Sequence, residues 1–236
     1  MRLIYPRLVG GLVLLLTPVL QRGALTWPSD TLWMVFTGLW LTTGCLLVSG
    51  RAARLAEVAL MLLTTALILG PGQHLHSALS LLLWISVVLV ITHDRPTERA
   101  LLIRVLVTSV YVFAVLTKLN PSFLAGEQIR GIISDRDHLE PFVEIVSSPV
   151  SVVVAWLTLG AEAWLAVGLW FRRTVVPTVV LGAALHLALI AVANNGTIWD
   201  VAFVGVLNLG LVASYLAFFE PVRPAEMATL RTPSRC

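Results

Sequence analysis

Charged residues are scarce in this sequence. They make up 12% of its 236 residues, whereas a soluble globular domain carries about 25%. Hydrophobic residues make up 58%, and the mean hydropathy is +0.90. An apolar excess of this size excludes an ordinary soluble domain and predicts an integral membrane protein. Its expected partners therefore include the lipid bilayer. The net charge of +3 comes from arginines that lie between apolar runs, so we expect no nucleic-acid partner.

Cysteine and lysine are nearly absent. Cys45 lies within an apolar run and Cys236 is the last residue, which supports neither a disulfide framework nor a cysteine-based metal site. Lys118 is the one lysine among 16 basic residues. The sequence also lacks a His-Glu-x-x-His pattern, a glycine-rich phosphate loop and a nucleophile elbow. The histidines have no convincing ligand spacing, and we expect no metal.

Long apolar runs, by contrast, are abundant, and eight of them approach the roughly 20 residues that a transmembrane helix needs. They are residues 8–27, 31–49, 53–70, 75–92, 100–119, 149–170, 174–194 and 198–218. We therefore predict an all-α, polytopic transmembrane helix bundle that forms a single domain over 1–219, with a disordered tail over 220–236. The first run has the alternative of a signal peptide, which would leave seven spans.

The distribution of basic residues predicts the orientation of this bundle. With the N-terminus inside, all but four of the 16 basic residues fall on the cytoplasmic side, and the exceptions are Arg22, Lys118, Arg130 and Arg136. Cytoplasmic loops are enriched in Lys and Arg. We expect both termini in the cytoplasm of a multi-pass cell-membrane protein.

The connection over 120–148 is longer than the other turns and rich in charge. Long connections within a compact bundle are usually functional. We predict that this segment caps the outer face after the fifth span and is partly helical from about 124 to 134, near the membrane interface.

Polar residues within the spans point to a site. On the fifth span, Arg104, Thr108, Tyr111 and Lys118 fall on one helical face, which should face the bundle interior. Lys118 lies at the outer end, where a lysine either snorkels to the headgroups or, in a dry cavity, loses its proton and acts as a base. Glu162 lies deep in the sixth span, and its expected depth favours a structural pair with Arg104.

Most histidines fall on the outer side. His74 and His76 open the fourth span, His138 lies in the long loop and His186 is buried in the seventh span. An isolated intramembrane histidine is more often a helix–helix hydrogen-bonding group than a catalyst. Together with Asn194, Asn195 and Asp200, which are also expected there, they predict that any site opens outward.

The stretch around Lys118 resembles a known family. The run Tyr-Val-Phe-Ala-Val-Leu-Thr-Lys-Leu-Asn-Pro-Ser-Phe-Leu-Ala-Gly over 111–126 is similar to the Lys-Leu, aromatic, Gly signature of the HTTM membrane domain, the family of vitamin K-dependent gamma-glutamyl carboxylases. The segment 132–142 resembles the family's next segment, which ends in Pro-Phe. Gln73-His74 and the pair His186 and Gly196 are weaker matches. The resemblance covers residues 72–218.

The resemblance implies a chemistry. In the carboxylases the matching lysine deprotonates a reduced naphthoquinone, so Lys118 would be the base for a quinol, and His74 and His186 would bind the quinone oxygens. Tyr111 and Asn195 complete the predicted cofactor-binding residues. The resemblance also implies that the site opens away from the cytosol.

The same resemblance leaves more than one function open. The chain ends soon after its last expected span, where carboxylases carry a large extra-membrane region, and we therefore do not expect peptide carboxylation. One hypothesis is a quinone-linked membrane oxidoreductase, or a carboxylase-like lyase, acting on a lipid-soluble small molecule. The other is a non-catalytic maturation, immunity or assembly factor for an exported peptide or a neighbouring membrane protein. A transporter is less favoured because neither repeats nor broken helices are visible.

Overall fold

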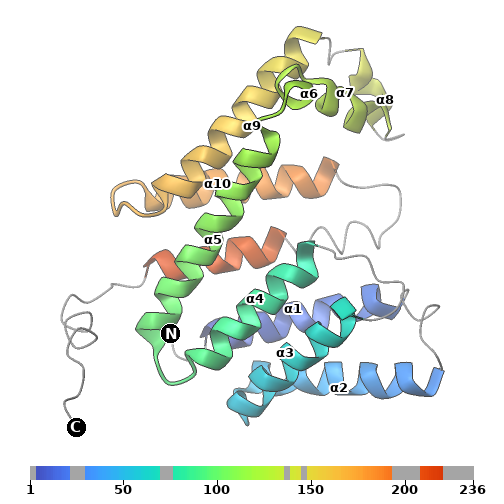
Figure 1. The fold of residues 1–236 in the computed structure, drawn as a ribbon, viewed down its shortest axis with the longest axis vertical. Helices are drawn as coiled ribbons and strands as arrows, with labels where there is room; N and C mark the ends of the chain where they lie inside the picture. The colour runs from blue at the N-terminus through green and yellow to red at the C-terminus, as the bar shows by residue number, and fades with distance from the viewer. Residues whose placement is uncertain are drawn as a thin grey trace.

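A computed structural model describes residues 4–21, 30–69, 77–135, 139–144, 148–192 and 208–219. All regular structure in these residues is helical, which confirms the predicted all-α class. The helices in Figure 1 are α1 (Ile4–Gln21), α2 (Asp30–Ser49), α3 (Ala53–Leu69), α4 (Ser77–Ile91), α5 (Pro96–Lys118), α6 (Pro121–Leu124), α7 (Glu127–Ser134), α8 (Glu140–Val143), α9 (Ser148–Gly168), α10 (Val175–Val192) and η3 (Tyr215–Phe219). Helix η3 continues the α-helical residues before it, and together they form the last helix, Asn208–Phe219. The predicted tail over 220–236 lies outside the described residues.

Within the part of the chain that the structure describes, four helices are long and apolar enough to cross a membrane. They are Thr31–Ser49, Pro96–Lys118, Pro149–Gly168 and Val175–Val192. The segments Ile4–Leu15, Ser80–Ile91 and Asn208–Phe219 are apolar but shorter. The structure thus supports a membrane protein with four span-length helices, while the count of eight spans stays a prediction.

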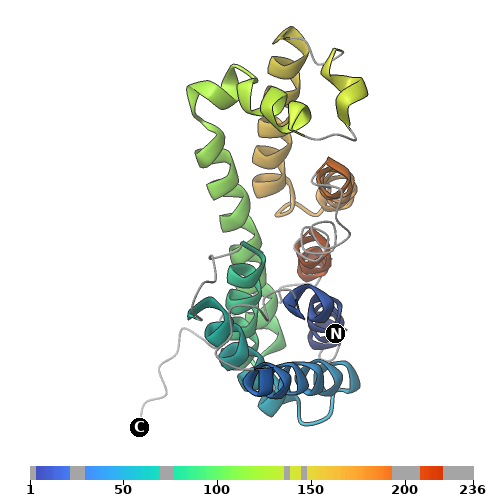
Figure 2. The ribbon, with the colours of Figure 1, turned by 90° about the vertical axis from the view of Figure 1, so that its right-hand side faces the viewer.

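Helix α5 is the element around which the others are arranged. It begins at Pro96, in the first turn, where the missing backbone donor costs nothing. It ends at Lys118, close before Pro121, because a proline disfavours helical geometry at the residue that precedes it. In Figure 2, α5 runs along the long axis, and α10, the last helix and α1 are seen end-on, one after another along its side. Three separate segments can therefore contact one face of α5.

The connection after α5 forms a helical cap on the first turns of α9. Asn120 begins α6 by accepting a hydrogen bond through its side-chain oxygen from the Phe123 backbone N–H, at 2.9 Å. Gly126 separates α6 from α7 with a φ of 73°, a conformation that favours glycine. The prediction that 124–134 is partly helical is confirmed by α7, and the chain turns at Gly126 between α6 and α7.

The cap is attached to α9 through Ser151. A Cβ atom at Gly126 would lie 2.6 Å from the Ser151 carbonyl carbon, so only glycine permits this approach. Arg130 on α7 donates a hydrogen bond from Nη1 to Ser151 Oγ at 2.7 Å. Ser151 is fully buried. These contacts place α6 and α7 beside the first turns of α9, just beyond the end of α5 (Figure 1).

Candidate functional site

Lys118 and Glu162 form an ion pair between α5 and α9. The ammonium Nζ of Lys118 lies 2.8 Å from Glu162 Oε1. The Lys118 side chain is 26% exposed and that of Glu162 is 7% exposed. An unpaired charge within a bilayer costs about 2.5–3.5 kcal/mol at the centre of a span on insertion scales, so pairing offsets a real penalty. The ammonium is turned toward a protein carboxylate, which disfavours the alternative of a snorkelling lysine.

The surroundings of the pair are unequal on its two sides. The Lys118 Nζ atom lies 5.9 Å from the centre of the buried Phe123 ring of α6, so the cap covers one side of the ammonium. On the other side, Glu162 Oε2 is buried and has no hydrogen-bond partner among the described residues. A carboxylate can accept several hydrogen bonds, and here only one oxygen is used within the part of the chain that the structure describes.

The register of α5 and α9 explains why Lys118 meets Glu162. Trp170, which follows α9, donates a hydrogen bond from its indole Nε1 to Thr108 Oγ1 of α5 at 2.8 Å. The two contacts, Lys118 with Glu162 and Thr108 with Trp170, proceed in opposite directions along the two helices. The helices are therefore antiparallel, and the first turns of α9 extend past the end of α5 (Figure 1).

The predicted pair between Glu162 and Arg104 was wrong. In this register Arg104 lies beyond the end of α9, and its Nε donates to the backbone oxygen of Ala217 at 2.9 Å. Its guanidinium carbon lies 5.6 Å from the centre of the Phe218 ring. The prediction counted depth from span ends that were taken to be level, and the overhang of α9 shifts Glu162 by several turns toward the Lys118 end of α5.

Tyr111, His186, Tyr215 and Asn208 form a buried polar network two turns from Lys118 along α5. The Tyr111 hydroxyl lies 2.6 Å from His186 Nε2 and also contacts the Tyr215 hydroxyl. His186 Nδ1 contacts Asn208 Oδ1. The network joins α5, α10 and the last helix.

The donors and acceptors of this network can be assigned from its ends. The Asn208 amide oxygen only accepts, so His186 Nδ1 is the donor to it. Nε2 of the neutral ring then accepts from the Tyr111 hydroxyl, and the Tyr111 oxygen accepts from Tyr215. Both ring nitrogens of His186 are thus engaged within the protein. This is the arrangement of a helix-joining histidine, the alternative that the sequence analysis favoured for an isolated intramembrane histidine.

Tyr215 and Asn208 were missed by the sequence analysis. They are seven residues apart and therefore share one face of the last helix, a spacing that would have identified them. The approach of Tyr215 to α10 depends on Gly182, because a Cβ atom there would collide with the Tyr215 hydroxyl and would lie 2.8 Å from Leu165 Cδ2.

Two predicted binding residues, His74 and Asn195, lie outside the described residues, as do His76 and His138. The described part of the site is therefore the Lys118–Glu162 pair together with the network around Tyr111.

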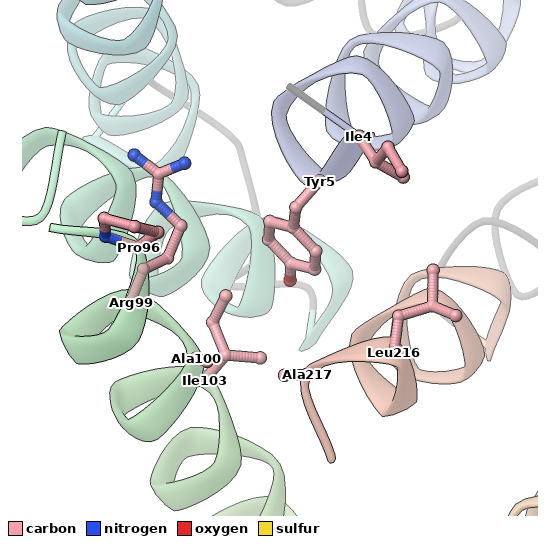
Figure 3. A pocket seen from close by; sticks show the side chains of 8 residues that line it. All are labelled: Ile4, Tyr5, Pro96, Arg99, Ala100, Ile103, Leu216 and Ala217. Atoms are coloured by element: carbon pink, nitrogen blue, oxygen red, sulfur yellow. The ribbon is translucent and has the colours of Figure 1, made fainter. Parts of the chain in front are cut away.

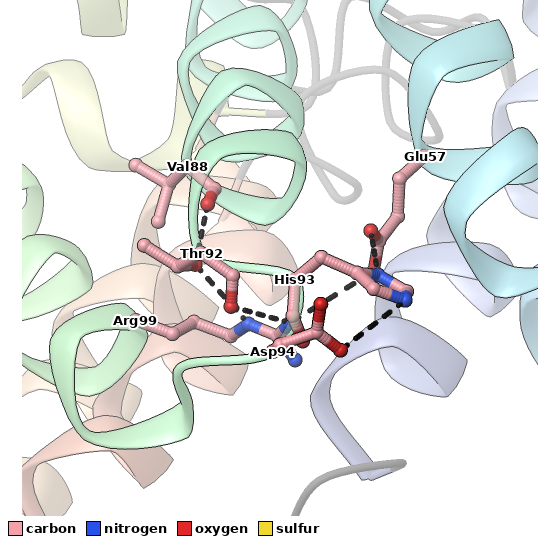
Figure 4. A network of polar contacts seen from close by, with 6 residues as sticks. All are labelled: Glu57, Val88, Thr92, His93, Asp94 and Arg99. Carbon is pink, nitrogen blue, oxygen red and sulfur yellow. Dashed lines mark hydrogen bonds and ion pairs between the residues drawn. The ribbon is translucent and has the colours of Figure 1, made fainter.

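A second polar cluster joins α3 to the turn between α4 and α5 (Figure 4). Glu57 is 1% exposed, and its Oε2 lies 2.6 Å from His93 Nδ1. Arg99 Nη2 lies 3.9 Å from Glu57 Oε1 and donates to the backbone oxygens of His93, at 2.8 Å, and Thr92, at 3.1 Å. A glutamate within an expected span was a signal for this cluster that the sequence analysis did not use. Glu57 Oε1 accepts no hydrogen bond among the described residues, and the other contacts of the cluster join the start of α3 to the turn before α5.

The cavity beside Arg99 is too small for a substrate. It lies where Tyr5 reaches from α1 toward α5 and the last helix (Figure 3). Its volume of about 30 Å³ has room for about two water molecules.

A larger apolar groove of about 660 Å³ lies between α4 and α5. Its walls include Trp84 and Ile91 of α4 and Val105, Ser109 and Phe113 of α5. These α5 residues face away from Tyr111 and Lys118, which point toward α9, α10 and the last helix. The groove does not open onto the ion pair.

No group of three or more His, Cys, Asp or Glu side chains that could hold a metal lies within the described ranges. No family model, curated protein or solved structure matches the chain.

Proposed function

We propose that this protein is a multi-pass membrane protein that binds and oxidises a lipid-soluble quinol, with Lys118 as the base at the non-cytoplasmic face. The observation that carries the proposal is the Lys118–Glu162 pair: the one lysine of the chain is held at 2.8 Å by a buried carboxylate inside the helical bundle. An arginine, which this chain uses at every other basic position, could join two helices equally well. Proton transfer requires a lysine, because arginine does not lose its proton in a protein.

The resemblance to the HTTM family around Lys118 supports the same chemistry. It implies a quinone or naphthoquinol as cofactor and a site that opens outward. The cap of α6 and α7 adds support, because its Phe123 ring covers the ammonium and reduces its contact with water. His74 and Asn195 stay in the proposal as binding residues, and the network of Tyr111 and His186 would support the quinone site from two turns away along α5.

A test begins with protein purified in detergent. Lipids extracted from the wild type should contain a quinone, and added short-chain naphthoquinol should be oxidised in air faster than without protein. Lys118→Ala and Lys118→Arg should both lower this rate by about 100-fold or more, the usual contribution of a positioned base. The proposal fails if no quinone co-purifies and the wild type does not accelerate quinol oxidation.

A second candidate function is a non-catalytic maturation, immunity or assembly factor for an exported peptide or a neighbouring membrane protein. The observation that favours it is the network of Tyr111 and His186, whose polar atoms bond to other helices and leave His186 no free nitrogen for a ligand. In this case Lys118 and Glu162 only join helices. Absence of quinone from the extract, with unchanged partner-dependent activity in Lys118→Arg cells, would favour this candidate.

A further inference from the structure

The ion pair raises a chemical question about the base. A lysine that donates a hydrogen bond to a carboxylate is an ammonium, which has three donors and no acceptor. Lys118 therefore cannot take a proton from a ligand while its own proton stays on Nζ. The base is available only if that proton has somewhere to go.

Glu162 is suited to receive the proton. Its Oε1 accepts the hydrogen bond from Lys118 Nζ at 2.8 Å, a distance across which a proton can move without displacement of either helix. Its Oε2 is buried and accepts no hydrogen bond within the described residues, so Lys118 is the one group there that bonds to this carboxylate. The side chain is only 7% exposed, so a proton on Oε1 would have little contact with solvent.

We propose that Lys118 and Glu162 act as one proton-accepting unit, in which Glu162 stores the proton that the ligand loses. This inference rests on the proposed function. In the step, the O–H bond of the quinol breaks and a new N–H bond forms on Lys118, while the N–H bond directed at Glu162 breaks and an O–H bond forms on Oε1. The products are a quinolate anion, a Lys118 ammonium and a neutral Glu162 acid. No electron is transferred in this step.

The charges balance at each stage. Before the step the site holds one ammonium and one carboxylate, and after it one ammonium and one quinolate, so its net charge does not change. A charge that stays inside a low-dielectric region is less costly to move than one that must be created there. The Lys118 ammonium remains beside the anion in both states. Glu162 acts on the ligand only through Lys118 and is a positioning residue.

We call this transfer of a proton from the ligand through Lys118 to Glu162 the relay. It can be distinguished by measurement from a simple attraction of the anion by the Lys118 ammonium. If Glu162 stores the proton, a bound phenol ionises and releases no proton to the solution. If the ammonium only attracts the anion, one proton is released for each phenol that ionises. The probe is 1-naphthol, which has an ionisable O–H and is not a quinol, with ionisation followed by absorbance and proton release by an indicator dye in weak buffer.

The wild type should ionise bound 1-naphthol at a pH where the free compound is neutral, without proton release. Glu162→Gln should either abolish this ionisation or couple it to proton release, and should slow naphthoquinol oxidation by about 100-fold or more. Glu162→Asp keeps a carboxylate and should retain part of both effects. Glu127→Gln is the matched control, since it removes one negative charge from the exposed surface of α7 in the nearby cap and should change neither.

Binding of oxidised 1,4-naphthoquinone, which has no O–H, separates a damaged pocket from a lost relay. Normal naphthoquinone binding with lost naphthol ionisation in Glu162→Gln supports the relay. Ionisation without proton release in Glu162→Gln overturns it and leaves the proposed function standing, as does proton release by the wild type. A wild type that binds neither compound overturns both.

Discussion

At the scale of single residues, each member of the Lys118–Glu162 ion pair compensates the charge of the other. The Glu162 side chain is almost fully buried, and Lys118 supplies its cation. Removal of one partner from a buried pair leaves a charge without compensation, whereas replacement of both by apolar side chains is often nearly neutral. Stability and chemistry can therefore be separated by comparing single and double variants.

We expect Lys118→Met to lower the free energy of unfolding by about 3 kcal/mol, the lower end for a broken buried pair because Lys118 is partly exposed. Glu162→Met should have a similar effect. The double variant should return to within about 1 kcal/mol of the wild type. Unfolding in detergent, followed by tryptophan fluorescence, measures all three. A double variant no more stable than the single variants would contradict the structural dependence of the two side chains.

Gly182 is a second residue whose identity is dictated by its neighbour. A methyl group there would overlap the Tyr215 side chain and Leu165, and overpacking of this kind costs about 1–3 kcal/mol. Gly182→Ala should therefore lower the unfolding temperature. Gly160→Ala on α9 is the control, since a Cβ there meets nothing within 4 Å and should leave stability unchanged or slightly higher. Equal effects of the two substitutions would mean that Tyr215 does not approach α10 as described.

At the scale of elements, the cap of α6 and α7 is attached to α9 in part by the hydrogen bond from Arg130 Nη1 to Ser151 Oγ, at 2.7 Å. A hydrogen bond to a charged group contributes about 1.5–3 kcal/mol. The cap should therefore open more readily than the helices beneath it when this bond is removed.

Arg130→Met keeps much of the side-chain volume and removes the donor. We expect faster hydrogen exchange over residues 121–134, by about 10-fold or more, with unchanged exchange in the middle of α9. Glu127→Gln, an exposed change on the same helix, serves as the control. An increase that extends through α9 would indicate that Ser151 holds the whole helix and not only the cap.

At the scale of the whole molecule, the position of the ion pair depends on the orientation of the chain in the membrane. The proposed orientation places both termini in the cytoplasm and the cap outside, from the distribution of arginine. The cluster of Glu57, His93 and Arg99 would then lie at the cytoplasmic ends of α3 and α5, at the opposite end of α5 from Lys118.

Cysteine labelling tests this orientation in a Cys45→Ala/Cys236→Ala background. A cysteine at Ser134, exposed on α7, should react with a membrane-impermeant reagent in intact cells. A cysteine at Asp94, whose side chain is 83% exposed, should react only after the membrane is permeabilised. The reverse pattern would place the Lys118–Glu162 pair at the cytoplasmic face and remove the outward-opening site from the proposal.

The helical class, the membrane character and the polar stripe of α5 followed from the sequence by itself, because apolar content and a 3.6-residue period are properties of a single segment. The partner of Lys118 did not, since it depends on how far α9 extends past α5, and that overhang is decided by the cap and by the contact between Thr108 and Trp170. The spacing of Asn208 and Tyr215 marks a polar face of the last helix, but their contact with Tyr111 and His186 could not be predicted, because it requires α10 and the last helix to meet α5 at one level. Tertiary packing, which sets the register between helices distant in sequence, decided which polar residues became partners.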